Sequence, residues 1–386
     1  MVKRYLKMEG TMFDVSDERV IKPAEIKVIG IGGGGGNAVN RMFKEGVNSI
    51  ELFVMNTDLQ VLSKSPIPDD HKIQIGAQLT KGQGAGKDPV KGKAAAEENA
   101  DEIRNLLQDT DMVFLTAGMG GGTGTGAMPV VAKIARELNI LTVCVVTKPF
   151  EYEGKRRMEI AEGGILELKS VADSLIVVSN EKSLEMFPDD SISDGFKHID
   201  MILVDTVRSL TEVITKPGRM NVDFADVKSI LSDKGDAIVG IGSGEGEQKA
   251  INAVSNALNN PLLEGVTFNG AESILFVITT GKNGLSMREW GDIGNFIKQR
   301  ADENANLIHG LVEKDDMEGK VEVVVVGTGL RKIEDQIENF YAMEDRIKRG
   351  DLEKPTYKRV KGMERSVDVN KPQDISIPAF LRRQAD

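Results

Sequence analysis

Residues 118–126 read Gly-Met-Gly-Gly-Gly-Thr-Gly-Thr-Gly, and most of the architecture can be worked out from this stretch. It follows an apolar run at 112–116, which predicts a β-strand, and it leads into a predicted helix over 125–138. Glycines leave backbone N–H groups uncovered, and a helix that begins in such a loop presents these groups to an anion. The stretch therefore predicts a phosphate-binding loop.

A second glycine run, Gly-Ile-Gly-Gly-Gly-Gly-Gly at residues 30–36, lies between a strand predicted over 26–31 and a helix predicted from Asn37. Two such loops after strands of one parallel sheet open into the same crevice. A pair of glycine loops with threonine hydroxyls suits a polyphosphate. The alternative, a nicotinamide-dependent oxidoreductase, explains the run at 30–36 but not the run at 118–126. Neither run contains the Gly-Lys-Ser/Thr of a P-loop. The nearest match in the chain, at residues 82–88, has Asp88 where a hydroxyl is needed.

The rest of the chain alternates between predicted strands and helices, which favours an α/β fold with a Rossmann-like, mostly parallel sheet covered on both faces. Apolar residues at three- and four-residue steps from Phe196 to Ile214 predict a long core-facing helix. Pro217 and Gly218 end this helix. Further strands and helices over 237–326 predict a second, smaller α/β domain.

Composition excludes several classes of protein. The 386 residues include 49 Lys and Arg against 60 Asp and Glu, a net charge of −11, which argues against direct binding of nucleic acid. The single cysteine, Cys144, excludes a disulfide framework, and its apolar neighbours favour a buried strand position. No apolar run reaches the ~20 residues of a membrane span, and no signal peptide precedes the fold. We therefore expect a cytoplasmic protein without direct membrane insertion.

These motifs resemble those of the FtsZ family, the tubulin-like bacterial cell division GTPases. Residues 120–126 match the family's Gly-Gly-Gly-Thr-Gly-Thr/Ser-Gly signature, and the likeness covers roughly 25–330 and the final peptide. It implies a GTPase with GTP or GDP and Mg²⁺ as cofactors. It also implies polymerisation-dependent activity in head-to-tail homopolymers and localisation at the midcell division ring. The expected parts are an N-terminal extension (1–24), a GTP-binding domain (25–190), a central helix (191–216), a C-terminal α/β domain (217–335), a charged segment and linker (336–372) that is disordered from about residue 350, and a partner-binding peptide (373–386).

The resemblance also implies a nucleotide site. Phe196 would stack on guanine, and Asp200 would accept hydrogen bonds from its N1–H and N2–H, since residues four apart share one face of a helix. The alternatives are a core residue for Phe196 and a solvated charge for Asp200. The full set of expected binding residues comes from the glycine loops, the loops after other strands and the central helix: Gly33, Gly34, Gly35, Gly36, Asn37, Asn56, Gly120, Gly121, Gly122, Thr123, Gly124, Glu153, Arg157, Asn180, Phe196 and Asp200.

Residues 221–226, Asn-Val-Asp-Phe-Ala-Asp, follow the helix breaker. Taken alone they fit a helix N-terminus with acids at the positive end of the dipole. The resemblance implies instead that Asn221, Asp223 and Asp226 are catalytic and act in trans. They would enter the next subunit's site, where the two carboxylates polarise the attacking water and the amide helps to orient it.

Residues 377–383, Ile-Pro-Ala-Phe-Leu-Arg-Arg, resemble the family's peptide for membrane-tethering and regulatory division proteins. Family members often carry a longer linker before it. The peptide favours cell division over the alternative of a tubulin-like filament GTPase with another task, such as DNA segregation. A filament without hydrolysis is the other alternative, and the three polar residues of 221–226 argue against it.

Overall fold

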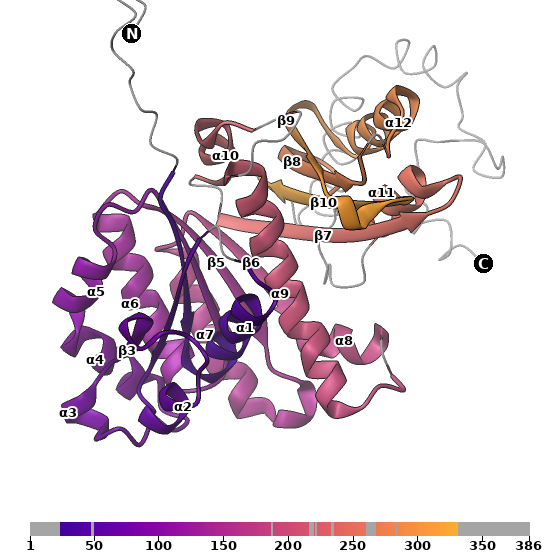
Figure 1. The fold of residues 1–386 in the computed structure, drawn as a ribbon. Helices are drawn as coiled ribbons and strands as arrows, with labels where there is room; N and C mark the ends of the chain where they lie inside the picture. The colour runs from indigo at the N-terminus through magenta and orange to yellow at the C-terminus, as the bar shows by residue number, and fades with distance from the viewer. Residues whose placement is uncertain are drawn as a thin grey trace, which may run out of the picture. The chain divides into compact units, whose positions relative to one another are not determined.

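A computed structural model describes residues 24–47, 50–186, 188–215, 220, 222–232, 235–259, 268–282 and 284–330. The expected N-terminal extension up to residue 23, the linker and the final peptide lie outside the described residues. Within them, the strands form a ten-stranded sheet in the order β3-β2-β1-β4-β5-β6-β7-β10-β8-β9 (Figure 1).

The first six strands in this order are all parallel. Their order places the first strand of the chain in the middle, so the direction of winding reverses between β1 and β4. This is the doubly wound arrangement of Rossmann-like folds. Their bounds are β1 (Ile26–Ile31), β2 (Glu51–Asn56), β3 (Lys72–Gln74), β4 (Met112–Gly118), β5 (Leu141–Lys148) and β6 (Ser174–Ser179).

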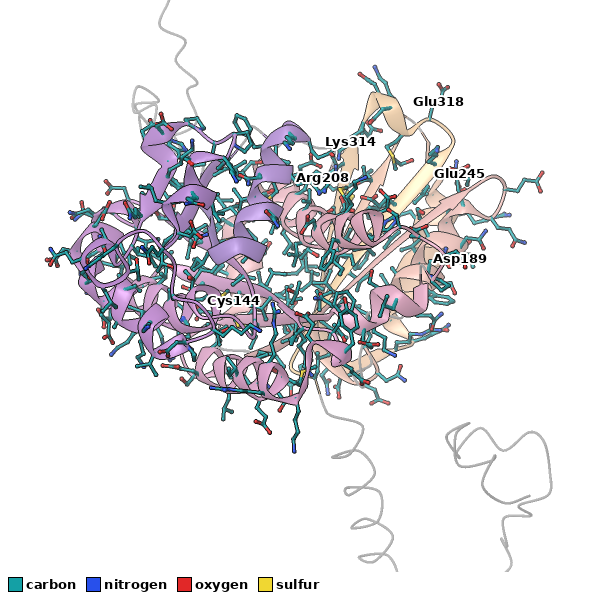
Figure 2. All side chains as sticks on the ribbon, turned by 90° about the horizontal axis from the view of Figure 1, so that it is seen from below. Cys144, Asp189, Arg208, Glu245, Lys314 and Glu318 are labelled. Atoms are coloured by element: carbon teal, nitrogen blue, oxygen red, sulfur yellow. The ribbon has the colours of Figure 1, made fainter. Side chains whose placement is uncertain are left out.

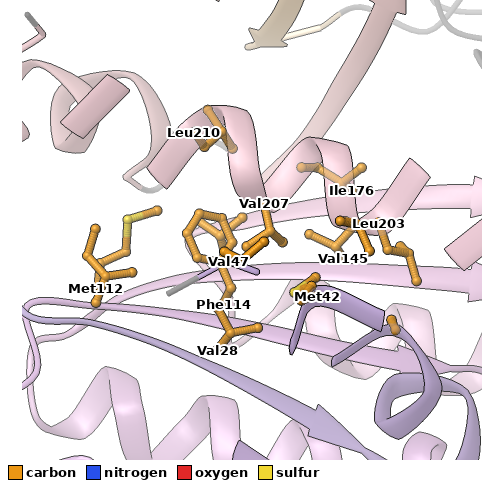
Figure 3. Packing of buried hydrophobic residues seen from close by; sticks show 14 of the residues in the cluster. Val28, Met42, Val47, Met112, Phe114, Val145, Ile176, Leu203, Val207 and Leu210 are labelled. Atoms are coloured by element: carbon orange, nitrogen blue, oxygen red, sulfur yellow. The ribbon is translucent and has the colours of Figure 1, made fainter. Parts of the chain in front are cut away.

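Helices cover both faces of this parallel sheet, because successive strand residues point to opposite sides. Val28 packs on one face with α1 (Gly32–Lys44) and α9 (Ile192–Thr215), and Ile29 packs on the other. Figure 3 shows Phe114 of β4 below Leu210 and next to Val207 of α9. The opposite face carries α4 (Pro89–Glu98), α5 (Ala100–Leu106), α6 (Thr123–Glu137) and α7 (Lys155–Lys169).

The second half continues the same sheet with different pairing. β7 pairs with β6 in parallel from Ser174, and then β10 pairs antiparallel with both β7 and β8. The sheet is therefore mixed rather than purely parallel. The elements of this half are α10 (Phe224–Leu231), β7 (Gly235–Glu245), α11 (Lys249–Leu258), β8 (Ala271–Thr280), α12 (Met287–Lys298), β9 (Ala301–Glu313), η3 (Asp315–Met317) and β10 (Lys320–Thr328). Lys314, labelled in Figure 2, joins this half to α9, since its Nζ lies 2.7 Å from Glu212 Oε2.

Several expectations from sequence need correction. The helix predicted from Asn37 begins instead at Gly32. Glycines in its first turns let α1 pack closely on β4, since a Cβ at Gly35 would lie 2.0 Å from Thr116 O. Helix propensity alone disfavours glycine there. Residues 89–106 form two helices rather than one, since Asn99 leaves the helical conformation and its Oδ1 accepts a hydrogen bond from Gly76 N.

Short elements between the predicted ones were not expected. They are α2 (Leu59–Ser63), η1 (Asp69–His71), β3, α3 (Ala77–Thr80), η2 (Glu151–Glu153) and α8 (Asn180–Met186). The buried position of Cys144 in β5 is confirmed (Figure 2), and burial raises the pKa of its thiol. Among the helices of the described ranges, none has the length and apolar character needed to cross a membrane.

Candidate functional site

The two glycine loops meet at the point where the strand order reverses. β1 and β4 are neighbours in register, with Ile31 opposite Ala117, so the chain leaves both strands at one edge of the sheet. A Cβ at Gly34 would lie 3.0 Å from Gly118 N, and one at Gly32 would lie 3.0 Å from Gly124 N. In open parallel sheets, ligands bind in the crevice outside the carboxyl ends of the strands at this reversal.

Both helices that start in these loops leave their N-termini open. The N-cap residues Ile31 of α1 and Gly122 of α6 have no side-chain cap among the described residues, and neither first turn holds an acid. By contrast, Asp88 caps α4 and Ser286 caps α12. First-turn N–H groups without a cap, together with the helix dipole, favour bound anions. Two such termini at one crevice suit a polyphosphate.

The glycines serve two different purposes. Gly30, Gly35 and Gly126 permit close backbone packing, because a Cβ at any of them would lie 2.3 Å or less from a backbone oxygen. At Gly33 and Gly121, a Cβ would meet nothing within 4 Å. These two positions border open space, which leaves room for a ligand against bare backbone.

The backbone N–H groups of the second loop are partly used within the protein. Gly120 N donates to Thr125 Oγ1 at 2.9 Å, and Gly122 N donates to Gly86 O at 3.0 Å. No described residue accepts from Gly121 N. Gly120 and Gly122 therefore shape the loop, whereas the N–H of Gly121 meets no acceptor among the described residues.

Residues 56–58 brace the second loop. Thr57 Oγ1 lies 2.7 Å from Thr123 Oγ1, while Asp58 Oδ1 accepts from the backbone N–H groups of Gln60 and Val61 and so caps α2. Asn56 is buried and its Oδ1 accepts from Asp58 N. These three residues bring the end of β2 to the start of α6.

The expected residues Glu153 and Arg157 also reach the second loop. Their side chains form an ion pair, and Glu153 Oε1 accepts from Phe150 N. Arg157 packs so closely on Gly120 that a Cβ there would lie 2.7 Å from Arg157 Cγ. Arg157 Nε is buried and has no partner within the described ranges.

Two polar side chains on α8 are buried without partners. Asn180 Oδ1 and Ser183 Oγ, one helical turn apart, form no hydrogen bond with any described residue. Buried polar atoms without partners cost free energy, so each is expected to meet a ligand group or water. Asn180 was expected at the ribose. Ser183 was missed, since nothing in its sequence context marks it as polar and buried.

A pocket of about 440 Å³ lies between α1 and α9. Phe196, for which a core position was the alternative, is 46% exposed and lines this pocket. Its ring packs edge-on against Phe150 at 5.6 Å. The full lining is Asn37, Asn40, Arg41, Lys44, Phe196, Lys197 and Asp200. Three of these residues were expected from sequence, whereas the four others were missed because basic and amide residues on an exposed helix face carry no motif.

Asp200 is not a solvated charge. Its side chain is 19% exposed, and burial raises its pKa to about 6, against the lowering effect of Arg41. An acid kept out of water in a pocket with an exposed aromatic ring is a candidate for recognition of a base edge.

The expected catalytic acids lie elsewhere. Asp223 is the exposed N-cap of α10 and makes no cap hydrogen bond there, and Asp226 is exposed in the first turn. Figure 1 shows α8 and α10 at opposite ends of α9. Asn221 lies outside the described residues. No cluster of three metal-ligating side chains occurs in the described part of the chain.

Comparison with known proteins agrees with this geometry. Residues 25–188 match the GTPase domain of the Tubulin/FtsZ family, and residues 235–331 match the C-terminal domain of the FtsZ family. The chain is 42% identical to the cell division protein FtsZ of Pseudomonas aeruginosa, over 97% of this chain and 100% of that protein. It is 44% identical to FtsZ of Coxiella burnetii, over 93% and 96%. A solved FtsZ dimer of M. jannaschii superposes with a TM-score of 0.76 at 43% identity, over 80% of this chain and 89% of that one.

A doubly wound sheet with two glycine loops at its reversal point, together with the match to the family's GTPase domain, defines a tubulin-like GTPase. Within that class, the chain belongs to the FtsZ family of cell division proteins. The resemblance, the fold class and the GTPase activity inferred from sequence are confirmed.

Proposed function

We propose that this GTPase hydrolyses GTP between two subunits of a head-to-tail filament, which assembles in the cytoplasm at the midcell division ring. The nucleotide binds the crevice of one subunit, and Asn221, Asp223 and Asp226 of the next subunit complete the site. The cell division name of the relatives favours this task over DNA segregation. The dimer of the M. jannaschii relative supports self-association.

The nucleotide fits the crevice in one direction. The phosphates lie against the open N-termini of α1 and α6, where Gly33 and Gly121 leave space. The ribose meets the unpartnered Asn180 Oδ1, with Glu153 and Arg157 between sugar and phosphates. The base enters the pocket at Phe196 and Asp200.

The chemistry requires a positioned water and stabilised phosphate charge. Exposed carboxylates such as those of Asp223 and Asp226 accept hydrogen bonds from water and orient its lone pair toward the γ-phosphorus. The products are GDP and inorganic phosphate. Mg²⁺ bound with the nucleotide would supply positive charge against the charge that develops on the phosphates, and this ion usually keeps several waters and needs few protein ligands.

The length of α9 is the observation that most supports an active site shared between two subunits. From Phe196 to Thr215 the helix rises about 29 Å at ~1.5 Å per residue. Asp223 and Asp226 follow the far end of this helix, so they do not touch the phosphates held by their own chain. A contact of one subunit's far end with the next subunit's crevice is heterologous, and it propagates as a filament.

Dependence of the GTP hydrolysis rate on protein concentration tests the proposal. A site shared between subunits gives negligible hydrolysis below a threshold concentration and a steep rise above it. If the rate per subunit stays constant across the series, the site is complete within one chain and the proposal fails.

A further inference from the structure

Arg41 of α1 faces Asp200 of α9 across the base pocket. Arg41 Nε lies 3.6 Å from Asp200 Oδ2, and the two side chains are 26% and 19% exposed. The Nε atom is buried, and no described residue accepts a hydrogen bond from it. The two groups therefore interact as an ion pair in a partly desolvated site, where water screens little of the attraction.

Burial and this ion pair act on Asp200 in opposite directions. Burial raises its pKa to about 6, and Arg41 is the cation that lowers it from the value that burial alone would give. The other charged side chains that line the pocket are Lys44 of α1 and Lys197 of α9. An arginine stays charged at any pH that a folded protein tolerates, so its effect on the carboxyl is constant.

The charge of Asp200 decides which base it can pair with. A carboxylate offers only acceptors, which match the N1–H and N2–H donors of guanine. A protonated carboxyl offers one donor and one acceptor, which match adenine N1 and its N6–H. The same side chain would thus favour guanine when ionised and tolerate adenine when neutral.

We propose that Arg41 is a positioning residue that holds Asp200 in its carboxylate form and so maintains the preference for guanine over adenine at neutral pH. The inference rests on the proposed placement of the base in this pocket. It adds a role for a residue that carries no sequence motif.

Calorimetric titration of the full chain with GDP and with ADP, between about pH 5 and pH 9, tests this role. Diphosphates avoid hydrolysis, and the ratio of the two affinities cancels the titration of the phosphates. In the unmodified protein the GDP preference falls as the pH drops through about 6. In Arg41→Ala the midpoint moves upward by about one pH unit or more. Arg41→Lys keeps a positive charge, so its midpoint lies close to that of the unmodified protein.

Two further variants separate this role from general damage. Asp200→Asn cannot titrate, so its affinity ratio is independent of pH, and adding Arg41→Ala to it changes the ratio no further. Arg104→Ala removes a cation from the exposed pair with Glu137, away from the pocket, and leaves the midpoint unchanged. Thermal unfolding of each variant at both ends of the pH range confirms that it is folded.

Three results of these titrations would contradict the proposed role of Arg41 or the proposed function. An unchanged midpoint in Arg41→Ala overturns the inference. An equal loss of GDP and ADP affinity at every pH also overturns it, because Arg41 would then contact the nucleotide or support the fold. Absence of GDP binding by the unmodified protein at alkaline pH overturns the proposed function itself, and the inference falls with it.

Discussion

The hydroxyl oxygens of Thr57 and Thr123 lie 2.7 Å apart and join the end of β2 to the first residue of α6. Thr57 is fully buried, so this hydrogen bond fixes the side chain of Thr123 in the second glycine loop. Thr57→Val keeps the shape but removes the bond. We expect the free energy of unfolding to fall by ~1 kcal/mol and GTP affinity to fall about fivefold.

Urea unfolding and nucleotide titration measure these two effects. Thr57→Ser retains a hydroxyl and is the matched control, with affinity close to that of the unmodified protein. Equal GTP affinity in Thr57→Val and Thr57→Ser would show that the bond does not position Thr123.

Gly33 and Gly35 are two residues apart, yet alanine should affect them in opposite ways. A Cβ at Gly35 would lie 2.0 Å from Thr116 O, so Gly35→Ala forces α1 away from β4 and costs about 3 kcal/mol or more of unfolding free energy. A Cβ at Gly33 meets nothing within 4 Å, so Gly33→Ala keeps the fold and instead fills space expected for phosphate.

Thermal unfolding without nucleotide and titration with GTP separate the two variants. Gly35→Ala should melt well below the unmodified protein. Gly33→Ala should melt normally and bind GTP more weakly. A normal melting temperature for Gly35→Ala would contradict the packing role assigned to that glycine.

The two glycine loops show which features of the fold and site could be predicted from the sequence. The strand and helix around each glycine run, the crevice between them and the family follow from residue pattern. Which glycine packs and which faces a ligand does not follow, because that depends on how closely α1 approaches β4. For the same reason the apolar pattern alone left a core position open as an alternative for Phe196: its spacing fits the buried stripe of α9, but its side chain is half exposed and lines a pocket. Arg41 was missed because an ion pair between the side chains of α1 and α9 leaves no pattern in the sequence of either helix.

The base pocket predicts nucleotide choice. Removing the ring in Phe196→Ala should cost ~1–3 kcal/mol of GTP binding, by analogy with base stacking on aromatic side chains. Asp200→Ala should narrow the preference for GTP over ATP, because guanine loses its acceptors while adenine loses none. Titration of both variants with labelled GTP and ATP checks this, and an unchanged preference in Asp200→Ala would remove that residue from the site.

The C-terminal peptide should be dispensable for assembly. The sheet and both glycine loops are complete by Thr328, so deletion of 373–386 should leave GTP hydrolysis within about twofold. It should abolish binding to a membrane-tethering division protein, because Ile377, Phe380 and Leu381 would provide the apolar anchors of a peptide that folds on a groove. Loss of filaments in the truncated protein, seen by light scattering, would contradict this assignment.

Asp226 tests where hydrolysis takes place. It is exposed on α10 and follows the end of α9 that lies about 29 Å from Phe196, so its removal should not disturb the nucleotide held by its own chain. Asp226→Ala should therefore bind GTP normally and still join filaments, but hydrolyse GTP very slowly. In mixtures with the unmodified protein, each variant subunit should silence the site of its neighbour, so activity should fall more steeply than the fraction of unmodified chains. Ser229→Ala, one turn further along α10, is the matched control and should lower activity little, because the Ser229 hydroxyl donates to the backbone oxygen of Asp226 and to no other described residue. Activity strictly proportional to the fraction of unmodified chains would show that each subunit hydrolyses its own GTP.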